Sequence, residues 1–247
     1  YTPYTITLSD GETITLNNIL IGEVWFCSGQ SNMEMPLAGF WNCPIQGANE
    51  TIATASQWKG IRVATIEKNG QLEPVESCKG SWKVSSPKNA PAFSATAFNF
   101  AIMMNRVLDI PVGIINCSWG GSTVEGWLPR DIVAQYKDIN LKKDIRKEEG
   151  HDWWHYMSPT IMYNGMLKPL QNYTIKGFIW YQGESNVGKH KTYPERLKTM
   201  VELWRKEWGL GELPFYYVEI APFGSKETNG SALLREAQFK AQSIISN

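Results

Sequence analysis

Short apolar segments of strand length recur along the chain, and they constrain its fold more than any other feature of the sequence. The segments span residues 19–27, 61–66, 112–116, 175–181 and 215–220. Each is rich in β-branched or aromatic residues, which is typical of strands that are buried on both faces of a parallel sheet. Helical patterns lie between them, so the order of elements predicts βαβ units. We therefore expect an α/β domain in three layers, with helices on both faces of a central, mainly parallel sheet of about five strands.

Three of the intervening stretches have apolar residues at helical spacing behind a residue that can cap a helix. Ser94 precedes a stretch that runs to about Leu108, Thr192 precedes the second stretch, and the third begins near Ser231. The apolar positions are Phe98, Ile102 and Met103 in the first, Leu197, Val201, Trp204 and Trp208 in the second, and Leu234, Ala237, Ala241 and Ile244 in the third. The charged stretch 137–149 is only weakly periodic, and we interpret it as a solvated helix or an excursion.

The first residues have a different pattern. Residues 4–8 and 12–16 alternate threonine with apolar residues on either side of Asp10 and Gly11, which predicts a β-hairpin. We interpret residues 1–18 as this hairpin, an edge or a remnant of a β region upstream. Residues 19–247 are expected to form one domain, since α/β domains often run past about 200 residues without dividing.

Small and polar residues follow three of the predicted strands. The three segments are Cys27-Ser28-Gly29-Gln30-Ser31-Asn32-Met33-Glu34, Asn116-Cys117-Ser118-Trp119-Gly120-Gly121-Ser122 and Trp180-Tyr181-Gln182-Gly183-Glu184-Ser185-Asn186. In a parallel sheet such segments meet at the carboxyl edge of the strands, where ligands bind. Together they offer a hydroxyl on a glycine turn, a glycine pair with free N–H groups and amide side chains. These are the parts of a nucleophile with an oxyanion hole.

These segments closely resemble the sialate O-acetylesterase family. The resemblance rests on residues 22–35, 113–116, 119–122 and 180–186, and it extends to residues 163–166, 204–205 and 234–238. The family belongs to the SGNH hydrolases and includes relatives that are acetylxylan esterases. The resemblance covers nearly the whole chain and implies a flavodoxin-like α/β/α domain that carries an esterase site.

The resemblance also implies roles for individual residues. The serine of the first segment is the family's nucleophile, which is Ser31 here rather than Ser28. Gly29 permits the tight turn before it, and a helix that starts at this point would stabilise negative charge on the serine oxygen. The glycine after the middle strand donates an oxyanion N–H, which points to Gly121, or to Gly120 if the register slips by one.

The third segment is expected to supply a further oxyanion donor from an amide side chain. Gln182 is the first choice and Asn186 the second. We expect Gln30 to contact the substrate. Glu184 either binds substrate or orients its loop, and the alternative is a carboxylate that only satisfies loop N–H groups.

A serine nucleophile needs a base, usually a histidine that an acidic residue orients. The family places this pair in a late Asp-x-x-His element. No Asp-x-x-His occurs in the 247 residues, so we expect that the element is cut off from this chain. The chain has three histidines, His151, His155 and His190. A relocated base among them is the alternative.

The expected function is hydrolysis of an acetyl ester on a sugar hydroxyl, with O-acetylated sialic acid as the first candidate. A sialic acid carboxylate needs a cation, for which Arg130 and Arg205 are candidates, although a surface or structural ion pair explains each equally well. Acetylated xylan or another hemicellulose is the rival substrate, and residues 37–57 and 139–154 would decide between the two. A carbohydrate-binding module without turnover is the rival from another class.

The composition of the chain excludes several classes of binding partner. Lys and Arg number 24, as do Asp and Glu, so the balanced charge predicts no nucleic-acid or anionic-membrane partner. No apolar stretch approaches the roughly 18 residues of a membrane span. The cysteines and histidines lack metal-site spacing, and the chemistry implied by the resemblance needs no cofactor. Cys43 and Cys78 lie in loop-like stretches where one disulfide would fit. The family implies an extracytoplasmic location, and the oligomeric state is left open.

Overall fold

The computed structural model describes residues 1–223 and 229–246. The strands are β1 (Tyr4–Asp10), β2 (Glu12–Ile19), β3 (Glu23–Gly29), β4 (Ile61–Ile66), β5 (Gly80–Val84), β6 (Val112–Ser118), β7 (Gly177–Tyr181) and β8 (Phe215–Tyr217). The α-helices are α1 (Ser31–Glu34), α2 (Ala48–Ala53), α3 (Ala95–Leu108), α4 (Arg130–Val133), α5 (Leu141–Asp144), α6 (Tyr193–Trp208) and α7 (Gly230–Ala241). No helix within these residues is both long enough and apolar enough to cross a membrane.

Six strands form the central sheet in the order β5-β4-β6-β3-β7-β8. All the pairings are parallel except that of β4 with β5, which is antiparallel. The five apolar segments are therefore strands, as predicted. The sequence pattern missed β5, because all of its residues are exposed at the sheet edge and Trp82 and Val84 alternate with polar residues.

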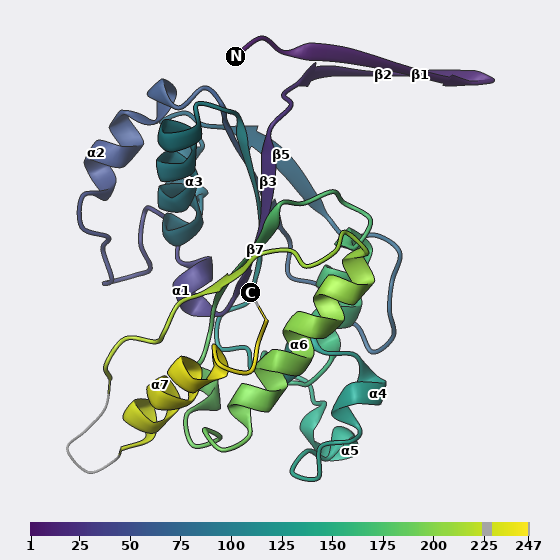
Figure 1. The fold of residues 1–247 in the computed structure, drawn as a ribbon, viewed down its shortest axis with the longest axis vertical. Coiled ribbons are helices and arrows are strands. Elements are labelled where there is room, and N and C mark those ends of the chain that lie inside the picture. The colour runs from purple at the N-terminus through teal and green to yellow at the C-terminus, as the bar shows by residue number, and fades with distance from the viewer. Residues whose placement is uncertain (224–228, 247) are drawn as a thin grey trace.

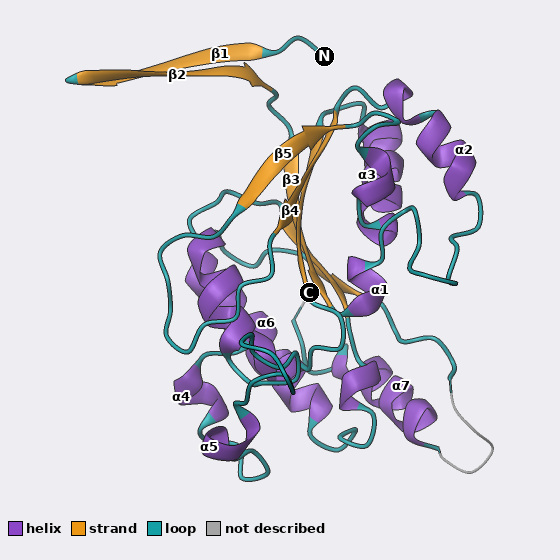
Figure 2. Cartoon of the chain, turned by 180° about the vertical axis from the view of Figure 1, so that it is seen from behind, coloured by secondary structure: helices purple, strands orange, loops and turns teal. Residues whose placement is uncertain are grey.

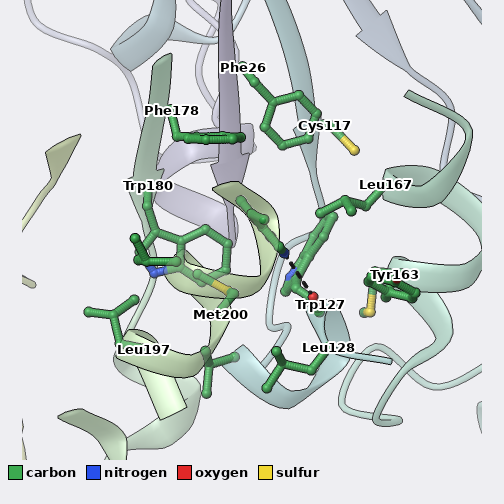
Figure 3. Close-up of a cluster of buried hydrophobic side chains, with 14 of the residues drawn as sticks. Phe26, Cys117, Trp127, Leu128, Tyr163, Leu167, Phe178, Trp180, Leu197 and Met200 are labelled. Carbon is green, nitrogen blue, oxygen red and sulfur yellow. Dashed lines mark hydrogen bonds between the residues drawn. The ribbon is translucent and has the colours of Figure 1, made fainter. Parts of the chain in front are cut away.

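Helices cover both faces of the sheet, which confirms the three-layer α/β fold. Helices α1, α2 and α3 lie on one face, and α4, α5 and α6 lie on the other (Figures 1 and 2). Alternation along β3 divides the core accordingly. Trp25 and Cys27 pack toward α3, whereas Phe26 packs toward α6, where it meets Phe178 and Trp204 edge to face. Figure 3 shows this second cluster around Phe26, Phe178 and Trp180.

The predicted helices are present, with two errors in their inward faces. In α3, Phe98 is buried but Met103 is 57% exposed, because five positions along a helix turn a side chain away from the starting face. Ile244 lies beyond the end of α7 and is also exposed. The stretch 137–149 contains the short helix α5, none of whose residues is buried.

The hairpin of β1 and β2 forms a separate sheet and projects from the body of the protein (Figures 1 and 2). Ile6 lies opposite Leu16 and Leu8 opposite Ile14, and all four side chains are exposed. Hydrogen bonds near its two ends join it to the domain: Asn105 donates to the Tyr1 hydroxyl, which donates to Asp109, and Arg62 donates to the Asn18 carbonyl and side chain.

All four cysteines are free thiols, and Cys43 is exposed. The disulfide between Cys43 and Cys78 that the sequence allowed is therefore not formed. Cys27 and Cys117 are buried, as expected of small apolar residues, and burial raises the pKa of both thiols.

Candidate active site

The three polar segments meet at one edge of the sheet. Strand β3 lies between β6 and β7, and its last residue, Gly29, pairs with Ser118 on one side and Tyr181 on the other. Because the three strands are parallel, each segment leaves the sheet at the same level. The convergence predicted from the sequence is therefore present.

Ser31 is the first residue of α1, directly after the turn at Gly29 and Gln30. Gly29 has a φ of +138°, and a Cβ there would lie 2.1 Å from the Tyr181 carbonyl oxygen, so only glycine fits. The Gln30 N–H donates to the same carbonyl at 3.0 Å, which fixes the turn against β7. Ser31 is half-buried at the edge of the sheet, whereas Ser28 is fully buried.

The glycine pair lies beside Ser31. A Cβ on Gly120 would lie 3.7 Å from the Ser31 Cβ, and the Gly120 N–H donates to the Glu34 carboxylate. The Gly121 N–H makes no hydrogen bond within residues 1–223 and 229–246. The Ser31 N–H, in the first turn of α1, likewise has no intrahelical acceptor. These contacts leave Gly121, rather than Gly120, with an N–H that is free to bind an oxyanion.

The Gln182 amide, in contrast, is used inside the protein. It is fully buried, and its Nε2 donates to the Ser122 carbonyl at 3.0 Å and to Asn186 Oδ1 at 2.7 Å. Its Oε1 accepts from the Tyr193 hydroxyl at 3.0 Å. Both N–H groups of Gln182 are therefore engaged by other residues in this structure.

Asn186 is buried and engaged in the same way. Its Nδ2 donates to both carboxylate oxygens of Glu125, at 3.0 and 3.2 Å, and its Oδ1 accepts from the Val124 N–H at 3.0 Å. The second-choice donor is thus also structural, because it joins the segments after β6 and β7.

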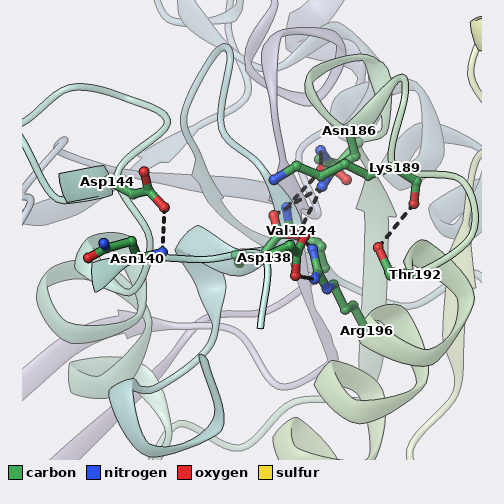
Figure 4. Close-up of polar contacts among 10 residues, drawn as sticks. Val124, Asp138, Asn140, Asp144, Asn186, Lys189, Thr192 and Arg196 are labelled. Carbon is green, nitrogen blue, oxygen red and sulfur yellow. Dashed lines mark hydrogen bonds and ion pairs between the residues drawn. The ribbon is translucent and has the colours of Figure 1, made fainter. Parts of the chain in front are cut away.

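A buried ion pair adds a further link between these segments and helix α6. Arg196 of α6 donates to Glu125 and to Asp138, and both Arg196 and Glu125 are buried. Figure 4 shows Val124, Asn186 and Arg196 gathered at this point, with Asp138 beside the guanidinium. We define Glu125, Asn186 and Arg196 as the buried polar junction. It ties the two segments that flank Ser31 to helix α6.

The free amide at the site is that of Gln30. Its Oε1 accepts the N–H groups of Gly183 and Ser185, each at 3.2 Å. Its amide N–H groups bond to no other residue in the described part of the chain. The side chain is thus held from β7 and has two donors to spare, which is consistent with the predicted contact to substrate.

Glu184 lies against the residue that follows Ser31. Asn32 Nδ2 donates to its Oε1 at 2.6 Å, while its Oε2 is buried and has no partner among the described residues. Burial raises the pKa of Glu184, because desolvation outweighs the hydrogen bonds that stabilise the charged form. Glu184 therefore holds the loop to α1 through Asn32, a residue to which the sequence analysis gave no role.

The two predicted arginines lie on helices α4 and α6. Arg130 is an exposed residue of α4. Arg205 is buried in α6, where its Nε donates to the Leu213 carbonyl at 2.8 Å and its Nη1 to the Ser246 carbonyl. Its guanidinium satisfies main-chain carbonyls, so it is not a cation for a substrate. Lys68, by contrast, lies beside the converging loops: its ammonium is 2.7 Å from the Glu34 carboxylate and 5.8 Å from the centre of the Trp119 ring.

Two of the three histidines contact residues other than Ser31. His155 Nδ1 accepts the Met157 N–H at 3.1 Å, and its Nε2 lies 3.6 Å from Glu148. His151 is exposed and stacks on Trp153. His190 has a buried Nδ1 without a partner in residues 1–223 and 229–246. No histidine side chain in this part of the chain is hydrogen-bonded to Ser31.

Two pockets lie beside these loops, and Lys68 lines both. One has a volume of about 510 Å³, and Glu34, Pro36, Phe40 and Pro91 are among its lining residues; we call it the proline-lined pocket. The other has a volume of about 680 Å³ and is lined by Lys68, Asn69, Gly70, Gln71, Trp119, Lys147, Asp152, Trp153 and Trp154; we call it the tryptophan-lined pocket. Ser31 lines neither, but its neighbours Glu34 and Trp119 do.

The mainly parallel sheet, its two helical layers and the loops that converge beside Ser31 define an α/β domain of the SGNH-hydrolase type. A carbohydrate acetylesterase from Xanthomonas citri has the same fold, with a TM-score of 0.83 and 31% identity, over 99% of this chain and 53% of that one. The family model described as carbohydrate esterase, sialic acid-specific acetylesterase, matches residues 21–246. The chain belongs to this family.

The curated proteins that are similar to this chain include two mammalian sialate O-acetylesterases. The chain is 26% identical to the mouse (Mus musculus) sialate O-acetylesterase, over 88% of this chain and 46% of that protein. It is 27% identical to the human (Homo sapiens) sialate O-acetylesterase, over 88% of this chain and 43% of that protein. The chain therefore spans less than half the length of these two relatives.

Proposed function

We propose that the protein removes acetyl groups from sugar hydroxyls through an acetyl-enzyme on Ser31. The observation that carries the proposal is the position of Ser31: it follows the central strand β3, beside the unpaired N–H of Gly121 and the spare amide donors of Gln30. A hydroxyl that faces several preorganised donors is the arrangement that acyl transfer requires.

In this mechanism the Ser31 oxygen attacks the acetyl carbonyl, and the sugar oxygen leaves with a proton. The N–H groups of Ser31 and Gly121 and the Gln30 amide bind the negative oxygen that develops on the carbonyl. Water then cleaves the acetyl-enzyme and releases acetate. We assign the base to a histidine of an Asp-x-x-His element outside these 247 residues, since no histidine side chain in the described part of the chain is hydrogen-bonded to Ser31.

The proposed substrate is an O-acetylated sugar, with sialic acid as the first candidate because the curated relatives are sialate O-acetylesterases. Lys68, which lines both pockets, replaces the two arginines as the cation for a carboxylate. Acetylated hemicellulose is the alternative substrate. The family resemblance further suggests an extracytoplasmic location.

Acetate release from p-nitrophenyl acetate and from O-acetylated sialic acid tests the proposal. It should be measured for this chain and for a form extended beyond Asn247. In the active form, Ser31→Ala should lower kcat/KM by roughly 10⁴-fold or more, since it removes the nucleophile. Ser28→Ala, which alters a fully buried serine of β3, is the matched control and should change little.

Activity that survives Ser31→Ala would refute the nucleophile. Turnover by the 247 residues alone would instead refute the placement of the base, and His151, His155 and His190 would then be replaced one at a time. If neither form releases acetate from any O-acetylated sugar, a binding module is the better description.

A further inference from the structure

The tryptophan-lined pocket is built by two segments that face each other across it. Residues 68–71 follow β4, and residues 146–154 belong to an excursion between β6 and β7. Trp154 packs on the first segment: a Cβ on Gly70 would lie 3.1 Å from its Cδ1. Lys147 holds the same ring from the second segment, with its ammonium 4.2 Å from the ring centre. The wall of the pocket is thus fixed by packing.

Trp153 is differently placed. It lines the same pocket, yet it is 56% exposed and is supported on one side by the His151 ring, whose centre lies 3.7 Å from its own. A large aromatic side chain that is held in place but left open to solvent is typical of a binding surface. Trp119, at the other end of the lining, directly precedes the glycine pair beside Ser31.

The volumes of the two pockets indicate the size of the ligand. Sites for whole small molecules measure roughly 300–1,000 Å³, so the proline-lined pocket alone suffices for a single sugar. The tryptophan-lined pocket provides a comparable volume on the other side of Lys68. A free acetylated monosaccharide would leave one of them empty.

We propose that the tryptophan-lined pocket binds a pyranose ring adjacent to the acetylated unit of the same glycan, with Trp153 as its stacking platform. The preferred substrates are then O-acetylated oligosaccharides rather than O-acetylated monosaccharides. This inference rests on the proposed function, since it takes Ser31 as the position of the acetyl group. The platform serves any glycan that presents a neighbouring pyranose, whether a xylan chain or a sialylated oligosaccharide.

The test measures binding separately from turnover. Calorimetric titration of the Ser31→Ala protein would compare O-acetylated xylose with O-acetylated xylohexaose, and free O-acetylated sialic acid with O-acetylated sialyllactose. We expect at least one oligosaccharide to bind about ten-fold more tightly than its monosaccharide, and the pair that shows the gain identifies the glycan. Trp153→Ala should abolish the gain without changing monosaccharide affinity, and Trp153→Phe should retain most of it.

Trp41→Ala is the matched control, because Trp41 is 90% exposed and lines neither pocket. It should leave every affinity unchanged. Equal affinity for the members of both pairs would overturn the inference, as would a gain that survives Trp153→Ala in a variant with a native circular-dichroism spectrum. A gain that depends on Trp153 but comes without Ser31-dependent acetate release would uphold the binding site and reject the esterase function.

Discussion

Glu125 and Arg196 show how single residues hold this site together. Each is buried, and each would be costly to desolvate alone. Glu125 also accepts two hydrogen bonds from Asn186, so its charge is satisfied from helix α6 on one side and from the segment after β7 on the other. The buried polar junction therefore fixes the backbone next to the proposed oxyanion donors, although its own polar groups are engaged with one another.

Glu125→Gln should destabilise the protein by about 3–5 kcal/mol, because Arg196 would remain buried without its principal counter-charge. Urea unfolding monitored by circular dichroism measures the change. Glu202→Gln is the control, since the pair of Glu202 with Lys198 is largely exposed, and it should shift the midpoint hardly at all. A loss as small as that of the control would show that the junction is not an energetic unit.

A second prediction at the scale of single residues concerns Glu184 and the pH dependence of stability. Its pKa is raised by burial, so the folded protein keeps this proton to a higher pH than the unfolded chain does. Wherever the folded state binds more protons, stability falls as the pH rises, and the fall begins above the ordinary glutamate pKa of about 4.5. Glu184→Gln removes this titration and keeps an oxygen for Asn32. Its stability relative to the unaltered protein should therefore increase from about pH 4 to pH 7. Parallel stability curves would contradict the assignment.

Among the elements, the Ser94 hydroxyl joins α1 to α3, beside a second contact in which the Thr96 hydroxyl donates to the Asn32 carbonyl at 2.9 Å. Ser94 caps α3 by accepting the Ala97 N–H at 3.1 Å, and it also donates to the Met33 carbonyl of α1 at 2.6 Å. The helix that carries Ser31 is only four residues long, and such a short helix is not stable by itself. Its position therefore depends on these contacts and on its packing against the sheet.

Ser94→Ala should cost about 1–2 kcal/mol, since it removes the cap and leaves the buried Met33 carbonyl without a donor. Thr192→Ala provides the comparison, because Thr192 precedes α6 but makes no capping hydrogen bond with its side chain. We expect that change to cost only a few tenths of a kcal/mol. Equal losses in thermal or urea unfolding would contradict the role of Ser94.

Across the whole molecule, the features that the sequence predicted are those that depend on local residue patterns, namely the strands and the position of the site. The apolar segments predicted every parallel strand of the sheet, and the residues that follow β3, β6 and β7 predicted where the site lies. It did not predict which amides remain free. The partners of Gln182 and Gln30 come from other strands and helices, so only the packed structure distinguishes them. The sequence likewise did not indicate that Lys68 lies beside the site, because its contacts with Glu34 and Trp119 depend on the tertiary fold.

Hydrogen exchange should separate the hairpin from the domain. Amides of β3 and β6 lie in the middle of the sheet and should exchange only with global unfolding. Amides of β1 and β2 belong to an exposed two-stranded sheet, which has marginal stability by itself, and should exchange orders of magnitude faster. Mass-spectrometric exchange on peptides from the two regions measures the difference. Equal protection would show that the hairpin is stabilised by contacts of its own.

The excursion that carries Trp153 closes on itself. The Arg146 N–H donates to the Ser158 hydroxyl at 3.1 Å, the same hydroxyl donates to the Arg146 carbonyl at 3.0 Å, and the His155 N–H donates to that carbonyl at 2.9 Å. Its two ends are therefore side by side, as in a loop that tolerates grafting. The segment can therefore be replaced between its two ends, which under the proposed function would change the glycan that is recognised and leave strands β3, β6 and β7 unaltered.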